Sequence, residues 1–115
     1  VDITILPPRC GLCGGVMKDD VVVFGEPIPD DVGERCAEEV GKTDCMVLIG
    51  TSAYVFPAAG FPRRVASHGG LLIEIGPHPT EISEVCENVV RGTAAEVLPQ
   101  VARAVASRMS LEGTP

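Results

Sequence analysis

The stretch CMVLIGTS, residues 45–52, decides the fold. Its apolar part, Cys45–Ile49, shows no alternation of apolar and polar residues, which is typical of a strand in a parallel sheet that is covered on both faces. A glycine and two small hydroxyl residues then end the strand. A second apolar run, Leu71–Ile75, stops in the same way at Gly76 and Pro77. Two such runs predict an α/β protein with a parallel sheet.

Helical patterns separate these strands. Asp30–Lys42 begins with two acidic residues, which suit the positive end of a helix. Its apolar residues share one helical face: Val32, Cys36, Ala37 and Val40. Residues 57–67 predict a second helix, which Pro62 is expected to kink. Thr93 and Glu96 have the spacing of a capping box. They open a third helix, whose apolar face carries Val97, Val101, Val105 and Met109.

Two further strands complete the expected order. The β-branched run DVVVF at residues 20–24 predicts one strand, and Asn88–Val90 predicts a short last one. Ligands of parallel sheets bind beyond the carboxyl ends of the strands. We therefore expect the loops after Ile49, Ile75 and Val90 to form the functional site.

Composition and charge exclude several classes of protein. The 115 residues carry a net charge of −7, which argues against nucleic acid and anionic membranes as partners. No run approaches the ~20 apolar residues that span a bilayer, and the first ten residues lack the pattern of a signal peptide. Five cysteines are an odd number with scattered spacing, which does not suit a secreted disulfide framework. A cytoplasmic location is expected.

Cys10 and Cys13 form a Cys-x-x-Cys pair followed by two glycines. This spacing places two thiolates on one side of a turn and lets backbone N–H groups approach the sulfurs, as in a zinc knuckle. Tetrahedral zinc needs four ligands, so the pair predicts half of a structural zinc site. A redox pair is the alternative, although that motif opens a helix. The remaining cysteines are expected to be small core residues: Cys36, Cys45 and Cys86.

Gly50, Thr51 and Ser52 directly follow a predicted strand. Backbone N–H groups and hydroxyls at such a place can bind ribose or phosphate, although an ordinary turn uses the same residue types. His68 and His78 have no partnering residue at a diagnostic spacing, which favours surface roles. The residues alone therefore indicate part of an α/β nucleotide-binding protein with half a metal site.

Five segments in this order resemble the sirtuin family, over a span from about Leu6 to about Val105. They are residues 8–15 (PRCGLCGG), 20–26 (DVVVFGE), 50–52 (GTS), 73–75 (IEI) and 92–99 (GTAAEVLP). They are similar, in turn, to the family's second zinc-cysteine pair, its substrate-binding strand, its dinucleotide loop and its two adenosine-side segments. Residues 55–61 (VFPAAGF) look most like the bacterial branch that includes desuccinylases.

The resemblance implies a role for each segment. Cys10 and Cys13 would supply two of four zinc ligands. The main chain of Val22, Phe24, Gly25 and Glu26 would pair with an acyl-lysine peptide or protein, and the Phe24 ring would pack on the acyl-lysine stem. The peptide would be flanked on its other side by Tyr54 and Val55. NAD would be bound by loop residues at the strand ends: Gly50, Thr51, Ser52, Gly76, Pro77, His78 and Ala94.

Two positions depart from the family pattern. Sirtuins usually carry Asn at the position of Gly76 and Glu at that of His78, both near the adenosine ribose. Gly76 has no side chain to hydrogen-bond a hydroxyl. Each lost neutral hydrogen bond costs on the order of 1 kcal/mol, so these departures are compatible with weaker binding of NAD and do not imply its loss.

The resemblance also implies a division of the chain. Residues 1–19 would be half of a zinc-binding module, residues 20–109 the C-terminal half of a Rossmann-like doubly wound sheet, and residues 110–115 a flexible tail. The other half of the enzyme, with a catalytic histidine as general base, is expected N-terminal to residue 1. The complete protein would be an NAD-dependent protein deacylase (deacetylase or desuccinylase), and this segment alone would be inactive. The alternative is a non-catalytic nucleotide-binding or zinc-dependent interaction module.

Overall fold

The computed structural model describes residues 7–112, and the side chains of residues 7–110. The chain forms two compact units, Val1–Gly33 and Glu34–Pro115, and we describe each by itself. The domain boundary predicted after residue 19 stays a prediction. Residues 1–6 of the predicted zinc module, and residues 113–115 of the predicted tail, lie outside the described residues.

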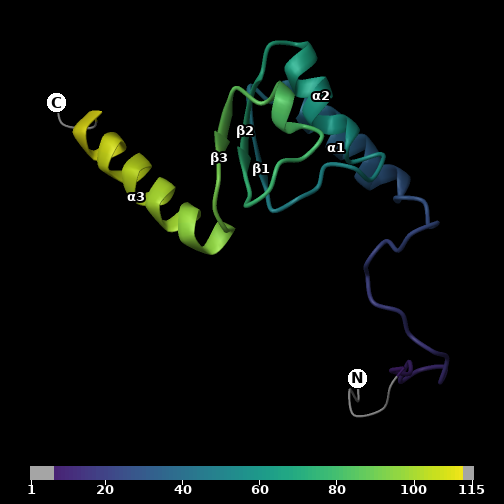
Figure 1. The fold of residues 1–115 in the computed structure, drawn as a ribbon. Helices are drawn as coiled ribbons and strands as arrows, with labels where there is room; N and C mark the ends of the chain where they lie inside the picture. Colours follow the sequence, from purple (N-terminus) through teal and green to yellow (C-terminus); the bar gives the residue numbers. More distant parts are fainter. Residues whose placement is uncertain (1–6, 113–115) are drawn as a thin grey trace. The chain divides into compact units, whose positions relative to one another are not determined.

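The second unit is built on a parallel sheet (Figure 1). Its strands are β1 (Cys45–Ile49), β2 (Leu71–Ile75) and β3 (Asn88–Val90), in the order β1-β2-β3. The register pairs Ile49 with Ile75, and Ile75 with Val90. All three carboxyl ends therefore meet at one edge of the sheet, which confirms the predicted α/β architecture and the predicted strand bounds.

Helices cover one face of this sheet. They are α1 (Asp30–Lys42), α2 (Gly60–Ser67) and the short η1 (Ser83–Val85), and the chain ends in α3 (Ala94–Glu112). Figure 1 shows α1 and α2 on the same side of the strands. The core between them holds Val40, Leu48, Val65, Leu72 and Ile82. Burial of each such side chain contributes roughly 1.5–3 kcal/mol relative to its exposure.

The opposite face of β1 differs from the prediction. We expected a strand covered on both sides, but Val47 and Ile49 are 46% and 40% exposed, while Leu48 is buried. An unbroken apolar run makes a strand suited to burial on both faces. Covering the second face also requires another segment to pack on it, which the run itself cannot provide. Cys45 is also exposed, so the prediction that it is a core residue is wrong, whereas Cys86 packs against the core.

Two helices begin or end away from their predicted bounds. The predicted helix at residues 57–67 starts only at Gly60, after a series of turns. Pro62 is its third residue, where an amide has no intrahelical acceptor, so the proline removes no hydrogen bond of the helix. The third helix, α3, extends through Glu112, so residues 110–112 of the predicted tail are helical. The flexibility predicted for residues 110–115 stays a prediction.

The start of α3 follows the predicted capping box in part. The Glu96 carboxylate accepts a hydrogen bond from the Thr93 amide at 3.1 Å, which satisfies a backbone donor at the helix start. Val97 is buried, but the rest of the predicted apolar face is exposed: Val101, Val105 and Met109. Among the described helices, none has both the length and the apolar character needed to cross a membrane.

The strand predicted at residues 20–24 is not formed. This segment belongs to the first unit, where Val21, Val22 and Val23 are exposed, and none of the described residues forms a strand beside them. β-Branched residues favour an extended backbone, but a strand also needs a partner for its N–H and C=O groups. The segment is therefore irregular, without a strand partner among residues 7–112.

Candidate functional site at the strand ends

Two glycines continue the sheet beyond its strands. The Gly50 amide donates to the Ile75 carbonyl at 3.0 Å, and the Gly76 amide donates to the Val90 carbonyl at 3.2 Å. Gly50 has a φ of +60°, a left-handed conformation that glycine adopts without strain. The chain therefore leaves the sheet sharply at this point, and Thr51 follows directly at the sheet edge.

A cavity of about 290 Å³ opens between the loops after β1 and β2. Its wall contains six of the residues that the sequence assigned to cofactor binding: Gly50, Thr51, Ser52, Gly76, Pro77 and His78. Backbone amides, hydroxyls and an imidazole thus share one wall, and these are groups that bind the ribose and phosphates of a nucleotide. The loops after β1 and β2 are distant along the chain, and they meet at this cavity as the sequence predicted.

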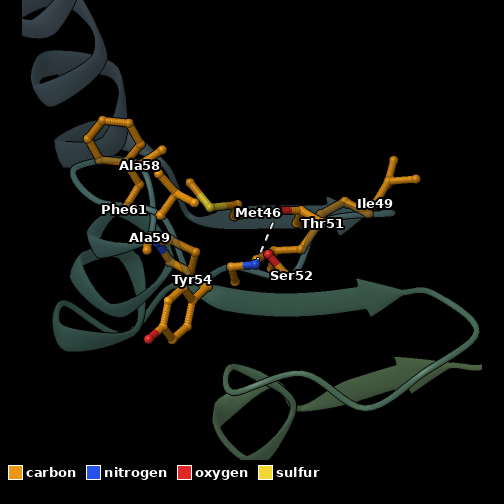
Figure 2. A pocket seen from close by; sticks show the side chains of 13 residues that line it. Met46, Ile49, Thr51, Ser52, Tyr54, Ala58, Ala59 and Phe61 are labelled. Atoms are coloured by element: carbon orange, nitrogen blue, oxygen red, sulfur yellow. Dashed lines mark hydrogen bonds between the residues drawn. The ribbon is translucent and has the colours of Figure 1, made fainter. Parts of the chain in front are cut away.

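A second cavity, of about 340 Å³, lies between β1 and α2 (Figure 2). Tyr54 and Val55 line it together with Thr51 and Ser52, and the Thr51 hydroxyl accepts a hydrogen bond from the Ala53 amide at 3.2 Å. Thr51 and Ser52 therefore border both cavities. One short loop connects the predicted cofactor residues with the predicted peptide-flanking residues.

Ala94 lies apart from these two cavities, since neither lining includes it. It is the first residue of α3. The segment just before it does approach the site, because the Gly92 amide lies 3.4 Å from the Gly76 carbonyl. The structure therefore brings the start of α3 to the loop after β2 without placing Ala94 in a cavity wall.

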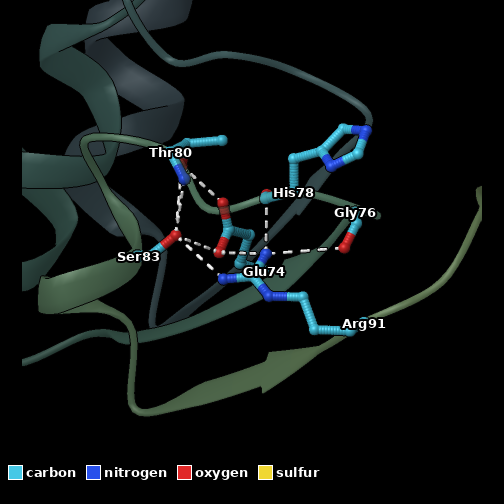
Figure 3. Close-up of polar contacts among 6 residues, drawn as sticks. All are labelled: Glu74, Gly76, His78, Thr80, Ser83 and Arg91. Carbon is cyan, nitrogen blue, oxygen red and sulfur yellow. Dashed lines mark hydrogen bonds and ion pairs between the residues drawn. The ribbon is translucent and has the colours of Figure 1, made fainter.

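Beneath the loop after β2 lies a polar cluster that the sequence analysis missed (Figure 3). Glu74 projects from β2 with a side chain only 3% exposed, and it pairs with Arg91 at 3.1 Å. Burial would raise the pKa of Glu74, but hydrogen bonds from Ser83 and Thr80 and the charge of Arg91 outweigh it and lower the pKa. The available signal was a single acidic residue inside the apolar run LLIEI.

The cysteine pair lies in a tight turn of the first unit. The Cys10 amide donates to the Gly15 carbonyl at 2.8 Å, and the Gly14 amide donates back to the Cys10 carbonyl at 2.9 Å. N–H groups of Cys13 and Leu12, and then the Cys13 thiol, lower the pKa of Cys10 by hydrogen bonding to its sulfur. This turn favours a thiolate at Cys10 and fits half of a tetrahedral metal site.

The segment assigned to the substrate also lies in the first unit. The Glu26 amide donates to the Val23 carbonyl at 3.0 Å, and the Glu26 carboxylate accepts from the Val23 amide at 3.1 Å. The Val23 amide, followed by Lys18, lowers the pKa of Glu26. Gly25 has a φ of +87° in this turn, and Phe24 is 90% exposed. The turn thus presents the Phe24 ring to solvent.

Comparison with known proteins identifies the family. The family model described as "Sir2 family" matches residues 3–57. An NAD-dependent protein deacylase of Mycobacterium leprae is 44% identical over 93 residues, which are 81% of this chain and 39% of that protein. The chain belongs to the Sir2 family. It spans about two fifths of the length of the curated Sir2 relatives that it matches.

Solved Sir2 structures share the fold. A serine-to-alanine mutant of a Sir2 homologue in complex with ADP-ribose matches with a TM-score of 0.86 and 41% identity, over 93% of this chain and 43% of that one. A Sir2 protein bound to a myristoylated histone peptide matches with a TM-score of 0.82 and 33% identity, over 90% of this chain and 44% of that one. The parallel sheet with its helices is therefore the Rossmann-like architecture of Sir2 proteins.

His68 takes no part in the strand-end site of this Sir2 chain. Its Nε2 lies 2.9 Å from the Thr43 carbonyl, and Thr43 precedes the amino end of β1. The cavity of about 290 Å³ lies at the carboxyl ends of the strands, at the opposite edge of the sheet. His78, in contrast, lines the cavity of about 290 Å³.

Proposed function

We propose that this chain forms part of an NAD-dependent protein lysine deacylase, acting on acetylated or succinylated lysine. The observation that carries the proposal is the meeting of two loops, after β1 and after β2, in one cavity at the strand ends of a Sir2 family chain. The curated relative named as a deacylase and the related structure with ADP-ribose support it.

In this proposal the cofactor lies along the wall of the strand-end cavity. Amides and hydroxyls of Gly50, Thr51 and Ser52 bind its ribose and phosphates, and Gly76 and His78 lie near its adenosine ribose. Ala94 belongs to the adenine side, which is supported by the hydrogen bond between Gly92 and Gly76. NAD would supply the electrophilic ribose carbon, which would bond to the acyl oxygen as its bond to nicotinamide breaks.

The acylated peptide would lie along residues 22–26, pairing with main-chain groups that the turn between Val23 and Glu26 leaves unused. Val22 is exposed and lies outside the strands of residues 7–112, so a peptide that adds a strand there would satisfy main-chain groups on both chains. Phe24 offers an apolar surface for the acyl-lysine stem. The related Sir2 structure that holds a myristoylated histone peptide supports this class of substrate.

Zinc would be held by Cys10 and Cys13 as two of four ligands in a structural site. The turn fits this role because it directs N–H groups at the Cys10 sulfur, and such hydrogen bonds stabilise a metal-bound thiolate. A structural zinc ion stabilises the fold around it and takes no part in the acyl transfer.

The test is an assay of the complete natural protein that contains these residues, with NAD and an acetylated or succinylated peptide. We expect nicotinamide release and loss of the acyl group in equal amounts. Ser52→Ala should raise KM for NAD more than KM for the peptide, whereas Ser107→Ala, on the exposed surface of α3, should change neither. Binding of ADP-ribose without any turnover would contradict the proposal and favour a non-catalytic nucleotide-binding domain.

A further inference from the structure

The cluster of Glu74, Thr80, Ser83 and Arg91 joins the core to the loop after β2 (Figure 3). Of the described residues, Glu74 is the buried charged one. A buried carboxylate persists only when hydrogen bonds and an opposite charge offset its lost hydration. Thr80 donates to one carboxylate oxygen of Glu74, and Ser83 donates to the other at 2.6 Å. The Glu74 carboxylate is therefore held in one position by its hydrogen bonds, and its backbone is part of β2.

Arg91 connects the Glu74 carboxylate with the backbone of the loop after β2. Its guanidinium lies 3.1 Å from Glu74, and it also donates to the His78 carbonyl at 2.8 Å and to the Gly76 carbonyl at 3.4 Å. The planar fork of an arginine can reach several acceptors at once, which a lysine ammonium on a flexible stem cannot do in the same geometry. One side chain thus connects β2 with two carbonyl groups of the loop.

Ser83 binds the last residue of the same loop, Thr80. Its hydroxyl accepts from the Thr80 amide at 2.8 Å and from Arg91 at 3.1 Å, while it donates to Glu74. This use of one donor and two acceptor positions exhausts the capacity of a hydroxyl. The loop from Gly76 to Thr80 is therefore hydrogen-bonded to the cluster at Gly76, His78 and Thr80.

The loop at residues 76–80 forms one wall of the strand-end cavity. The cavity lining contains every residue from Gly76 to Thr80. A loop that is ordered before its ligand arrives loses less conformational entropy on binding than a loop that must first become ordered. Glu74 also borders the cavity, but its side chain is only 3% exposed and both of its carboxylate oxygens accept hydrogen bonds from within the cluster.

We propose that Glu74 and Arg91 are positioning residues, which hold the loop at residues 76–80 in the conformation that receives the dinucleotide cofactor. They act through the loop backbone and do not touch the cofactor themselves. This inference rests on the proposed function, because it assigns the cofactor to the cavity that the loop borders. It adds the residues that order one wall of that cavity.

Arg91→Lys is the first variant for the test, with Arg103→Lys on the exposed surface of α3 as its matched control. Arg91→Lys keeps the positive charge beside Glu74 and loses most of the bonds to the loop. In the complete natural protein, we expect KM for NAD to rise about three- to tenfold, with kcat and KM for the peptide within about twofold of wild type. Arg103→Lys should leave all three constants unchanged.

Hydrogen exchange of the ligand-free protein provides a readout that does not depend on activity. We expect the amides of Gly76, His78 and Thr80, the loop residues that carry an exchangeable N–H, to exchange faster in Arg91→Lys, while amides of β1 and α2 keep wild-type rates. Ser83→Ala is the second variant, for the case that Arg91→Lys does not fold. It removes the bond to the Thr80 amide and should likewise speed exchange and raise KM for NAD.

The outcomes separate the two proposals. Unchanged exchange at the amides of Gly76, His78 and Thr80 would overturn the positioning role whether or not the protein uses NAD. Faster exchange with an unchanged KM for NAD would show that the ordering of the loop does not affect cofactor binding, and it would overturn that part of the proposal. Failure of the wild-type protein to consume NAD, or to bind ADP-ribose, would overturn the proposed function itself and the assignment of the cofactor to this loop.

Discussion

The amide nitrogen of Gly76 lies 3.2 Å from the carbonyl oxygen of Val90. Gly76 thus extends the ladder between β2 and β3 by one residue and brings its own Cα to the wall of the strand-end cavity. A Cβ atom added at Gly76 meets no atom within 4 Å. The backbone of this position therefore accepts a side chain, and that side chain would project where the cofactor ribose is proposed to lie.

Gly76→Asn should strengthen the binding of NAD. The asparagine amide can hydrogen-bond a ribose hydroxyl, and one such bond is worth about 1 kcal/mol, or about a fivefold lower KM for NAD. The free energy of unfolding should change by less than about 0.5 kcal/mol, because the site is open. Gly76→Ala is the matched control and should leave KM unchanged. An equal effect of both variants would contradict the ribose contact.

Gly70→Ala should destabilise the fold. The added Cβ would lie 2.4 Å from Cγ1 of Val65 and 3.0 Å from the Thr43 carbonyl, and Val65 is fully buried and cannot move aside. Such overpacking costs about 1–3 kcal/mol. Equilibrium urea unfolding measures it. Gly41→Ala is the control, because its Cβ meets only the far end of Arg64 at 4.0 Å, and it should be neutral or slightly stabilising.

Phe24→Ala should impair the use of substrate and leave the fold intact. The ring is 90% exposed, so its removal should change the free energy of unfolding by less than about 0.5 kcal/mol. If a bound acyl-lysine buries the ring, the loss in kcat/KM for the peptide is expected to reach roughly 2–4 kcal/mol. Val21→Ala should have a smaller effect on both quantities. Normal stability with wild-type peptide kinetics in Phe24→Ala would remove this segment from the substrate groove.

The buried carboxylate of Glu74 should make stability depend on pH. Its pKa is lowered below the usual value of 4.5 in the folded state, so the unfolded chain takes up a proton first as the pH falls. The stabilisation by Glu74 is therefore complete above about pH 5 and is lost as the pH falls through the folded pKa. Urea unfolding between pH 7 and pH 3 should show this loss.

Variants at two glutamates make that test specific. Glu74→Gln should be destabilised by about 1–3 kcal/mol at pH 7 and should approach the wild-type stability in acid. Glu84→Gln, on an exposed site of η1, should follow the wild-type curve. Parallel curves for Glu74→Gln and wild type would show that Glu74 does not carry the pH dependence.

Zinc should bind to the 115-residue chain weakly, at less than one ion per chain after dialysis against a mild chelator. The reason is that Cys10 and Cys13 provide two ligands, and no group of three or more candidate ligands gathers elsewhere in residues 7–112. Elemental analysis measures the zinc content. Cys13→Ser should abolish the binding, and Cys45→Ser should not alter it. One tightly held ion per chain would show that other residues complete the site.

The sequence by itself determined the elements whose causes are local. The apolar runs Cys45–Ile49 and Leu71–Ile75 end at glycines, and the strands end there too. Acidic residues open α1, and the Thr93 and Glu96 pair opens α3. Each of these signals acts between residues a few positions apart, where backbone preference and periodicity decide the outcome. The strand-end site followed because parallel strands align their carboxyl ends.

Only the tertiary structure decided the contacts between distant residues. Residues 20–24 have the β-branched composition of a strand, yet within residues 7–112 no strand pairs with them. Glu74 and Arg91 are far apart along the chain, and their pairing depends on the register that sets β3 beside β2. Propensity acts within one segment, whereas pairing and burial need a partner that another segment supplies. That is why the sequence predicted the residues that line the cavity, and the fold revealed the residues that hold its wall in place.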